Sequence, residues 1–111
     1  MRQSAEIAGD LGLKPMRAML EIAGELGCPV TVHTTNPAGS PEEILKMLRP
    51  GDVYAHVYHG KGRTILDERE NVIPALYEAQ KRGVILDAAN GGNHFSFRVA
   101  KAAIRQGFCR M

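Results

Sequence analysis

Three short apolar runs alternate along the chain with longer stretches in which apolar residues recur every three or four positions. The runs are rich in β-branched residues, which favours strands, and they cover residues 30–34, 53–57 and 84–88. The periodic stretches predict amphipathic helices at about residues 14–26, 41–49, 72–82 and 96–106. The predicted order is therefore helix, strand, helix, strand, helix, strand, helix.

Residues with capping preferences stand at the expected helix ends. Pro15 suits a first helical turn, and Gly27 suits a left-handed C-cap. Ser40, Pro41 and Glu43 supply an N-cap, a first-turn proline and the glutamate of a capping box. These residues mark both ends of the first predicted helix and the start of the second, which Pro50 and Gly51 end.

Short apolar strands separated by helices of about ten or more residues require parallel pairing with right-handed crossovers. We therefore predict an α/β fold, with three parallel strands alternating with four helices, in a single domain over residues 1–111. A parallel sheet is normally covered on both faces. This chain has too few elements for that, which indicates part of a larger architecture.

Two of the predicted strands carry a histidine next to their carboxyl end. His33 closes the run Pro-Val-Thr-Val-His, and His56 closes Asp-Val-Tyr-Ala-His. Because the carboxyl ends of parallel strands meet at one edge of a sheet, we expect the two imidazoles to lie close together. Neutral imidazole binds zinc and related divalent ions, so the pair predicts a metal site. Taken singly, each histidine would also fit a hydrogen-bonded structural residue.

A third histidine follows closely in the chain. His59 is three residues beyond His56, an odd separation that places side chains on opposite faces of a strand. We therefore expect His59 to be a loop residue and not a further ligand. The basic, glycine-rich segment 60–63 lacks the spacing of a phosphate-binding loop, so we expect a solvated loop there.

The end of the third apolar run offers two further candidates. Asp87 fits a catalytic carboxylate and a helix N-cap equally well. Residues 90–94, Asn-Gly-Gly-Asn-His, could bring bare backbone close to a ligand, which makes Asn90 and Gly91 the predicted substrate-binding residues. The alternative is a tight turn before the last helix.

Composition excludes several classes of partner. A net charge of +2, 5% aromatic residues and the lack of tryptophan argue against a nucleic-acid-binding protein. No stretch approaches the about 20 apolar residues that span a bilayer, so no membrane partner is expected. The polar first residues and the distant Cys28 and Cys109, which match no metal or redox spacing, predict a cytoplasmic protein with two reduced, buried thiols.

Five segments together resemble the amidohydrolase superfamily, and especially its deacetylase- and dihydroorotase-like metallohydrolases. They are residues 30–33, 51–56, 60–62, 83–87 and 95–100, in this order. The resemblance implies a (β/α)8 TIM barrel with a binuclear metal centre, usually zinc, at the carboxyl ends of the strands. It also implies hydrolysis of amide and related bonds by metal-activated water.

The resemblance can be followed residue by residue. His33 matches the metal ligand of barrel strand five, and His56 matches that of strand six. Arg2, Gln3 and Ser4 match the stretch just after strand four, whose bridging lysine would precede Met1. The strand-one histidines and the strand-eight aspartate have no counterpart here. The chain thus resembles the part of the barrel from the end of strand four to helix seven.

The resemblance implies a fragment of a metal-dependent amidohydrolase that acts on a small-molecule amide and is inactive alone. With two ligands where catalytic zinc needs at least three, we expect weak or incomplete zinc binding. The alternative is a non-catalytic α/β module that self-assembles or complements a partner chain. In a complete barrel, segments 30–34 and 84–88 each pair with a strand that this chain does not contain. We therefore expect them to be exposed sheet edges here, and we expect a homo-oligomer, most simply a symmetric dimer, that covers them.

Overall fold

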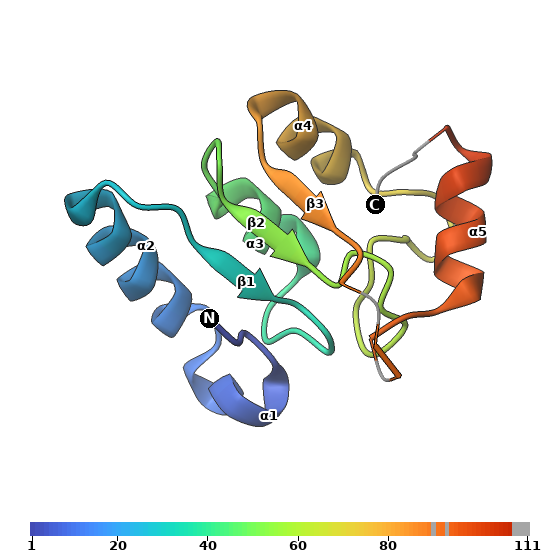
Figure 1. Cartoon of the computed structure of the whole chain (residues 1–111). Coiled ribbons are helices and arrows are strands. Elements are labelled where there is room, and N and C mark those ends of the chain that lie inside the picture. The colour runs from blue at the N-terminus through green and yellow to red at the C-terminus, as the bar shows by residue number, and fades with distance from the viewer. Residues whose placement is uncertain (90, 93, 108–111) are drawn as a thin grey trace.

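A three-stranded parallel sheet organises the chain (Figure 1). The computed structural model describes residues 1–89, 91–92 and 94–107. The strands follow the order of the sequence: β1 (Thr31–His33), β2 (Val53–Ala55) and β3 (Ile85–Asp87). Both pairings are parallel, with Val32, Tyr54 and Leu86 in register. The predicted α/β class with three parallel strands is therefore confirmed.

The residues that the structure describes form one α-helix more than the four predicted. The helices are α1 (Ala5–Ala8), the 3-10 helix η1 (Gly9–Leu11), α2 (Lys14–Leu26), α3 (Pro41–Met47), α4 (Pro74–Arg82) and α5 (Phe97–Arg105). The additional helix is α1. It has only four residues, about one turn, which is too short to show a helical period in the sequence.

The capping residues act as the sequence indicates. Gly27 is left-handed with φ 69°, and its N–H donates to carbonyls of the last turn of α2. The Ser40 hydroxyl accepts the N–H of Glu43 at 3.1 Å, which satisfies one free donor at the start of α3. Helix α4 begins at Pro74, two residues later than predicted, because Ile73 before the proline is extended with ψ 139°.

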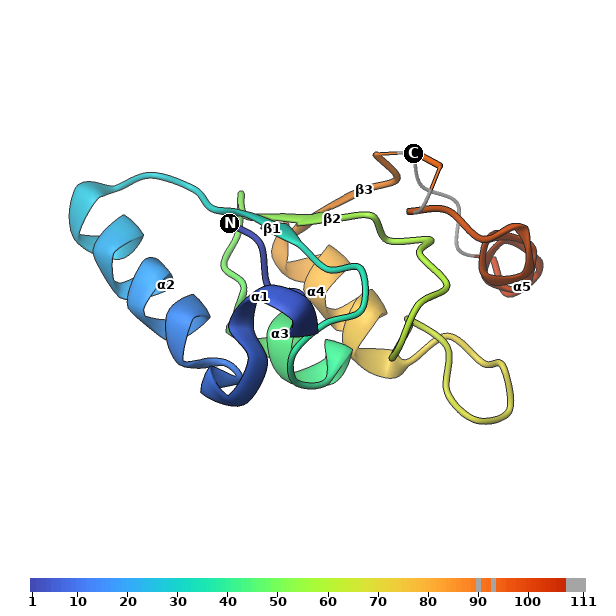
Figure 2. The same ribbon diagram turned by 90° about the horizontal axis from the view of Figure 1, so that it is seen from below.

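The sheet is covered on one face only. Figure 2 shows α2, α3 and α4 on the same side of the strands. Val32, Tyr54 and Leu86 point to these helices and are at most 2% exposed. On the opposite face Ile85 is 53% exposed, and no helix of the described residues packs there. One face of a normally two-sided parallel sheet is therefore open.

The outer edge of β1 differs from the prediction of a bare strand. The His33 N–H donates to the carbonyl of Met1 at 2.8 Å, and the Gln3 N–H donates to the carbonyl of His33 at 3.1 Å. The first residues thus add a short parallel bridge beside β1. Among the described residues β3 pairs with β2 alone, so the predicted exposed edge is found on that side.

Helix α5 lies away from the sheet and packs on the long connection between β2 and α4 (Figure 1). The Gln106 side chain accepts the N–H of Val72 at 2.7 Å and donates to the carbonyl of Glu70 at 2.8 Å. Arg98 forms an ion pair with Glu70. These contacts fix the segment after β3 against the segment after β2. In the described part of the chain, none of the helices combines the length and apolarity needed to cross a bilayer.

Candidate metal centre

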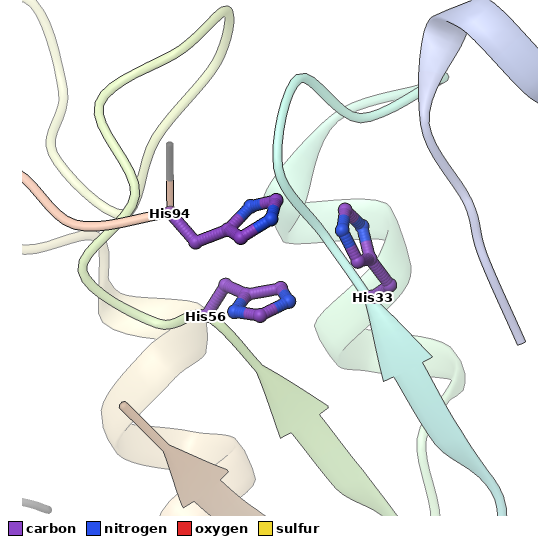
Figure 3. Close-up of side chains that lie close together, drawn as sticks. All are labelled: His33, His56 and His94. Atoms are coloured by element: carbon purple, nitrogen blue, oxygen red, sulfur yellow. The ribbon is translucent and has the colours of Figure 1, made fainter. Parts of the chain in front are cut away.

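Three histidines meet at the carboxyl end of the sheet (Figure 3). His33 is the last residue of β1, His56 directly follows β2, and His94 lies between β3 and α5. The ring centres of His33 and His56 are 4.4 Å apart. The ring centre of His94 lies 4.9 Å from that of His33 and 4.1 Å from that of His56. One ring nitrogen from each can be chosen so that all three lie within 4.8 Å of one another.

An unusual backbone conformation turns His56 toward His33. His33 is in register with Ala55, so a regular strand would place the next residue, His56, on the opposite face. His56 instead has φ 62°, in the left-handed region, which costs a non-glycine residue about 1–2 kcal/mol. Strained residues of this kind concentrate at functional sites, where the surrounding structure holds them.

Hydrogen bonds to the outer nitrogens orient two of the rings. His56 Nδ1 lies 2.9 Å from the carbonyl oxygen of Ala89, so this nitrogen carries the proton and donates. His94 Nδ1 pairs with the hydroxyl of Thr35 at 2.9 Å. In both residues Nε2 remains for a ligand, and metal-binding histidines commonly show this arrangement. His33 Nδ1 is buried without a hydrogen-bond partner among the described residues.

The surroundings favour neutral imidazole, the form that binds metal. Burial lowers the pKa of His33, and the neighbouring His56 and His94 lower it further. Burial also lowers the pKa of His94, followed by the proximity of His56 and Lys61. The lowered pKa values of His33 and His94 leave their ring nitrogens more readily available to a metal ion, because metal-binding imidazole must be unprotonated at the binding nitrogen.

The remaining candidate site residues of the sequence analysis are Gly91, Asn90 and Asp87. Gly91 is beside the cluster, because a Cβ built on it would lie 3.3 Å from His94 Cδ2. Asn90 lies outside the described residues, and the substrate-binding role of both stays a prediction. Asp87 accepts the N–H of Ala89 at 3.1 Å, and Ser96, not Asp87, is the N-cap of α5.

His59 is a loop residue outside the three-histidine cluster, in accordance with its predicted place. Its side chain is nevertheless fully buried, and neither ring nitrogen has a hydrogen-bond partner among the described residues. Burial, and next the proximity of His56, lowers the pKa of His59 to about 4. His59 is therefore neutral at physiological pH.

His94 is the residue that the sequence analysis did not select. Its place in a glycine-rich segment was assigned to substrate contacts through bare backbone, not to a ligand. The available indication was positional, since His94 follows the third strand and that strand also ends at the edge of His33 and His56. The other glycine-rich segment, residues 60–63, is exposed, in agreement with the predicted solvated loop.

Comparison with known proteins agrees with the predicted resemblance to the amidohydrolase superfamily. No family model matches the chain. A deacetylase of Brucella anthropi is 36% identical over 107 residues, which are 96% of this chain and 27% of the relative. The crystal structure of an adenine deaminase is 31% identical with a TM-score of 0.90, and the match covers 99% of this chain and 30% of that one. The crystal structure of a dihydroorotase is 37% identical with a TM-score of 0.81, and that match covers 98% of this chain and 28% of the dihydroorotase chain.

The resemblance to the amidohydrolase superfamily is thus confirmed, and the fold is part of a TIM barrel. The chain spans less than a third of the length of these relatives.

Proposed function

We propose that this chain forms the metal-binding centre of a metal-dependent amidohydrolase that hydrolyses an amide bond of a small molecule. His33 and His56 are the proposed ligands and zinc is the proposed metal. The observation that carries the proposal is the meeting of these two rings at the carboxyl end of the sheet, in a chain similar to deacetylases. In TIM barrels this end carries the chemistry.

The donor set fits a divalent ion of the zinc type. It consists of two imidazoles: burial lowers the pKa of His33, which favours the neutral form that binds metal, and His56 donates its Nδ1–H to the carbonyl of Ala89. Zinc bound there would polarise a substrate carbonyl and lower the pKa of a bound water. His56 holds its proton on Nδ1 and thereby keeps Nε2 free for coordination.

Metal titration tests the proposal. Cys28 is exposed, so the prediction of a buried thiol is wrong at this position, and an exposed thiol could bind metal by itself. Zinc and cobalt(II) binding is therefore measured by calorimetry in a variant with both thiols removed, Cys28→Ser and Cys109→Ser. His33→Ala and His56→Ala are each expected to weaken binding at least about tenfold, because each removes one ligand. Unchanged affinity in both variants would refute the proposed metal site.

We also propose that these 111 residues alone do not complete an active site. The resemblance places the bridging lysine and the water-activating aspartate in segments that the chain does not include. General-base catalysis is typically worth about 10²–10⁴-fold in rate. The same preparations should therefore hydrolyse N-acyl amino acids or dihydroorotate at no more than background rate, with or without zinc. A cytoplasmic location stays a prediction.

The alternative function, a non-catalytic module that assembles with a second copy of the chain, is favoured by a different observation. The open sheet face is accompanied by exposed apolar residues on α2, where Ile22 is 53% and Leu26 73% exposed. They border a pocket of about 210 Å³ between α2 and β1. Apolar surface of this kind commonly marks a protein interface.

Light scattering at micromolar concentration tests this assembly. We expect a dimer, and we expect Leu26→Lys to shift it toward monomer because a charge would be buried in the contact. Lysine is compatible with the last turn of a helix, so folding should be preserved. Ile104→Lys on α5 is the matched control, since Ile104 is 56% exposed but outside the α2 face. A monodisperse monomeric wild type would rule out the assembly.

A further inference from the structure

We infer that His94 is a third protein ligand, so that the described chain holds one divalent ion with three histidines of its own. This inference rests on the proposed metal site and extends it. Two imidazoles make a weak site, whereas three protein ligands with an open fourth position are the composition of a catalytic zinc site. The ion would then bind more tightly than His33 and His56 alone allow.

The loop after β1 orients the His94 ring. Thr35 is 5% exposed, and its hydroxyl pairs with His94 Nδ1 at 2.9 Å. This contact joins segments 59 residues apart in the chain. With Nδ1 engaged by Thr35, Nε2 is the nitrogen of His94 that remains for a metal, and Nε2 of His56 remains likewise because its Nδ1 donates to the carbonyl of Ala89. Two rings with their outer nitrogens engaged and their inner nitrogens free are typical of ligands held in place before the metal binds.

A close backbone approach places the segment that carries His94. The N–H of Ser96, two residues after His94, donates to the carbonyl of Tyr58 at 2.8 Å. A Cβ built on Gly60 would lie 2.8 Å from Ser96 Cβ, closer than packed atoms allow, and 3.1 Å from its Oγ. The φ angle of Gly60 is not positive, so the contact with Ser96 is the reason for glycine here. We assign Gly60 as a positioning residue for His94.

Binding an ion requires a limited movement of the ring. The His56 and His94 rings are stacked at 18°, so their lone pairs do not yet converge on one point. The chosen nitrogens lie within 4.8 Å, whereas two ligands of tetrahedral zinc are about 3.4 Å apart. A Cβ built on Gly92 meets nothing within 4 Å, so there is open space beside Gly92, two residues before His94.

The inference is tested by titrating cobalt(II) into the variant that lacks both thiols. Absorption and calorimetry measure the binding, so the test does not depend on activity. Cobalt absorption reports the geometry and ligand number of the site. We expect about one cobalt per chain in this reference protein, and His94→Ala should weaken binding by about a hundredfold. Gly60→Ala should weaken it by about tenfold, the lower end for loss of an outer contact. Gly92→Ala, a methyl group added to open space in the same segment, should bind as the reference does.

A rescue variant separates displacement of His94 from general damage. Gly60→Ala combined with Ser96→Gly removes the Cβ that the new methyl group meets, and glycine is still acceptable at an N-cap. Cobalt affinity should return toward that of the reference protein. If Gly60→Ala alone does not fold, the double variant is compared directly with Ser96→Gly, and equal affinities support the steric assignment.

The outcomes distinguish this inference from the proposed function. If His33→Ala loses cobalt while His94→Ala binds as tightly as the reference, His94 is not a ligand and the proposed function stands. If all three histidine variants bind as tightly as the reference, both are wrong. Reference affinity in Gly60→Ala overturns the positioning role of Gly60.

Discussion

Replacing Asp52 with alanine is expected to lower the free energy of unfolding by about 3 kcal/mol. Asp52 is 1% exposed and connects three parts of the chain. Its carboxylate accepts the N–H of Val30 and the N–H of Arg49, both at 2.8 Å, and the Arg49 guanidinium at 3.0 Å and 3.1 Å. Alanine would leave the buried N–H of Val30 without an acceptor, just before β1.

The size of the expected loss in stability depends on how well water solvates Arg49 after the Asp52 carboxylate is removed. The Arg49 side chain is 34% exposed, so its charge is partly solvated after the carboxylate is lost, and we place the effect at the lower end for broken buried pairs. Asp52→Asn keeps one oxygen acceptor and should cost less than Asp52→Ala. Urea denaturation at pH 7 measures both. A loss below 1 kcal/mol for alanine would contradict the structural role of this carboxylate.

Local capping chemistry made the helices predictable. Helix α2 begins and ends at the predicted residues, because Pro15 and Gly27 act through their own backbone preferences. Ser40 likewise identifies the start of α3. In contrast, α1 has one turn and no period, and its presence depends on tertiary contacts such as the N–H of Ala5 donating to the carbonyl of Asn36 at 2.7 Å.

The strands were predicted in the right places but with too great a length. Each apolar run has five residues, whereas each ladder has three. The difference at the end of β2 has a specific cause, since the left-handed His56 turns the chain out of the sheet. No sequence pattern specifies a positive φ at a histidine. The conformation that brings His56 to His33 was therefore not predictable from the run that precedes it.

The site was predictable only as far as the strands define it. His33 and His56 follow from the topology of parallel strands, which places their carboxyl ends at one edge. His94 follows no strand directly, and it reaches the cluster through Thr35 and through the contact of Gly60 with Ser96. Such contacts between distant segments leave no periodic pattern in the sequence. The same reason explains why the burial of His59 was not foreseen.

Acidification of the metal-free protein from pH 6.5 to 4 is expected to lower the free energy of unfolding by about 3 kcal/mol through His59 alone. In the folded chain burial, and next the proximity of His56, lowers the pKa of His59 to about 4, while an unfolded histidine titrates near 6.5. Between these values the unfolded state binds a proton that the folded state does not. Stability therefore falls as pH falls, and this loss is complete below about pH 4.

His59→Leu isolates this contribution, because leucine fills a similar buried volume and does not titrate. Urea denaturation is measured with a chelator present at pH 7, 5.5 and 4.5 in both proteins. His33 and His94, whose pKa values are also lowered, contribute in the same direction in each protein, so their effect cancels in the comparison. The stability of the wild type relative to His59→Leu should decrease steadily over this range. A difference that does not change with pH would show that His59 is not held neutral by its burial.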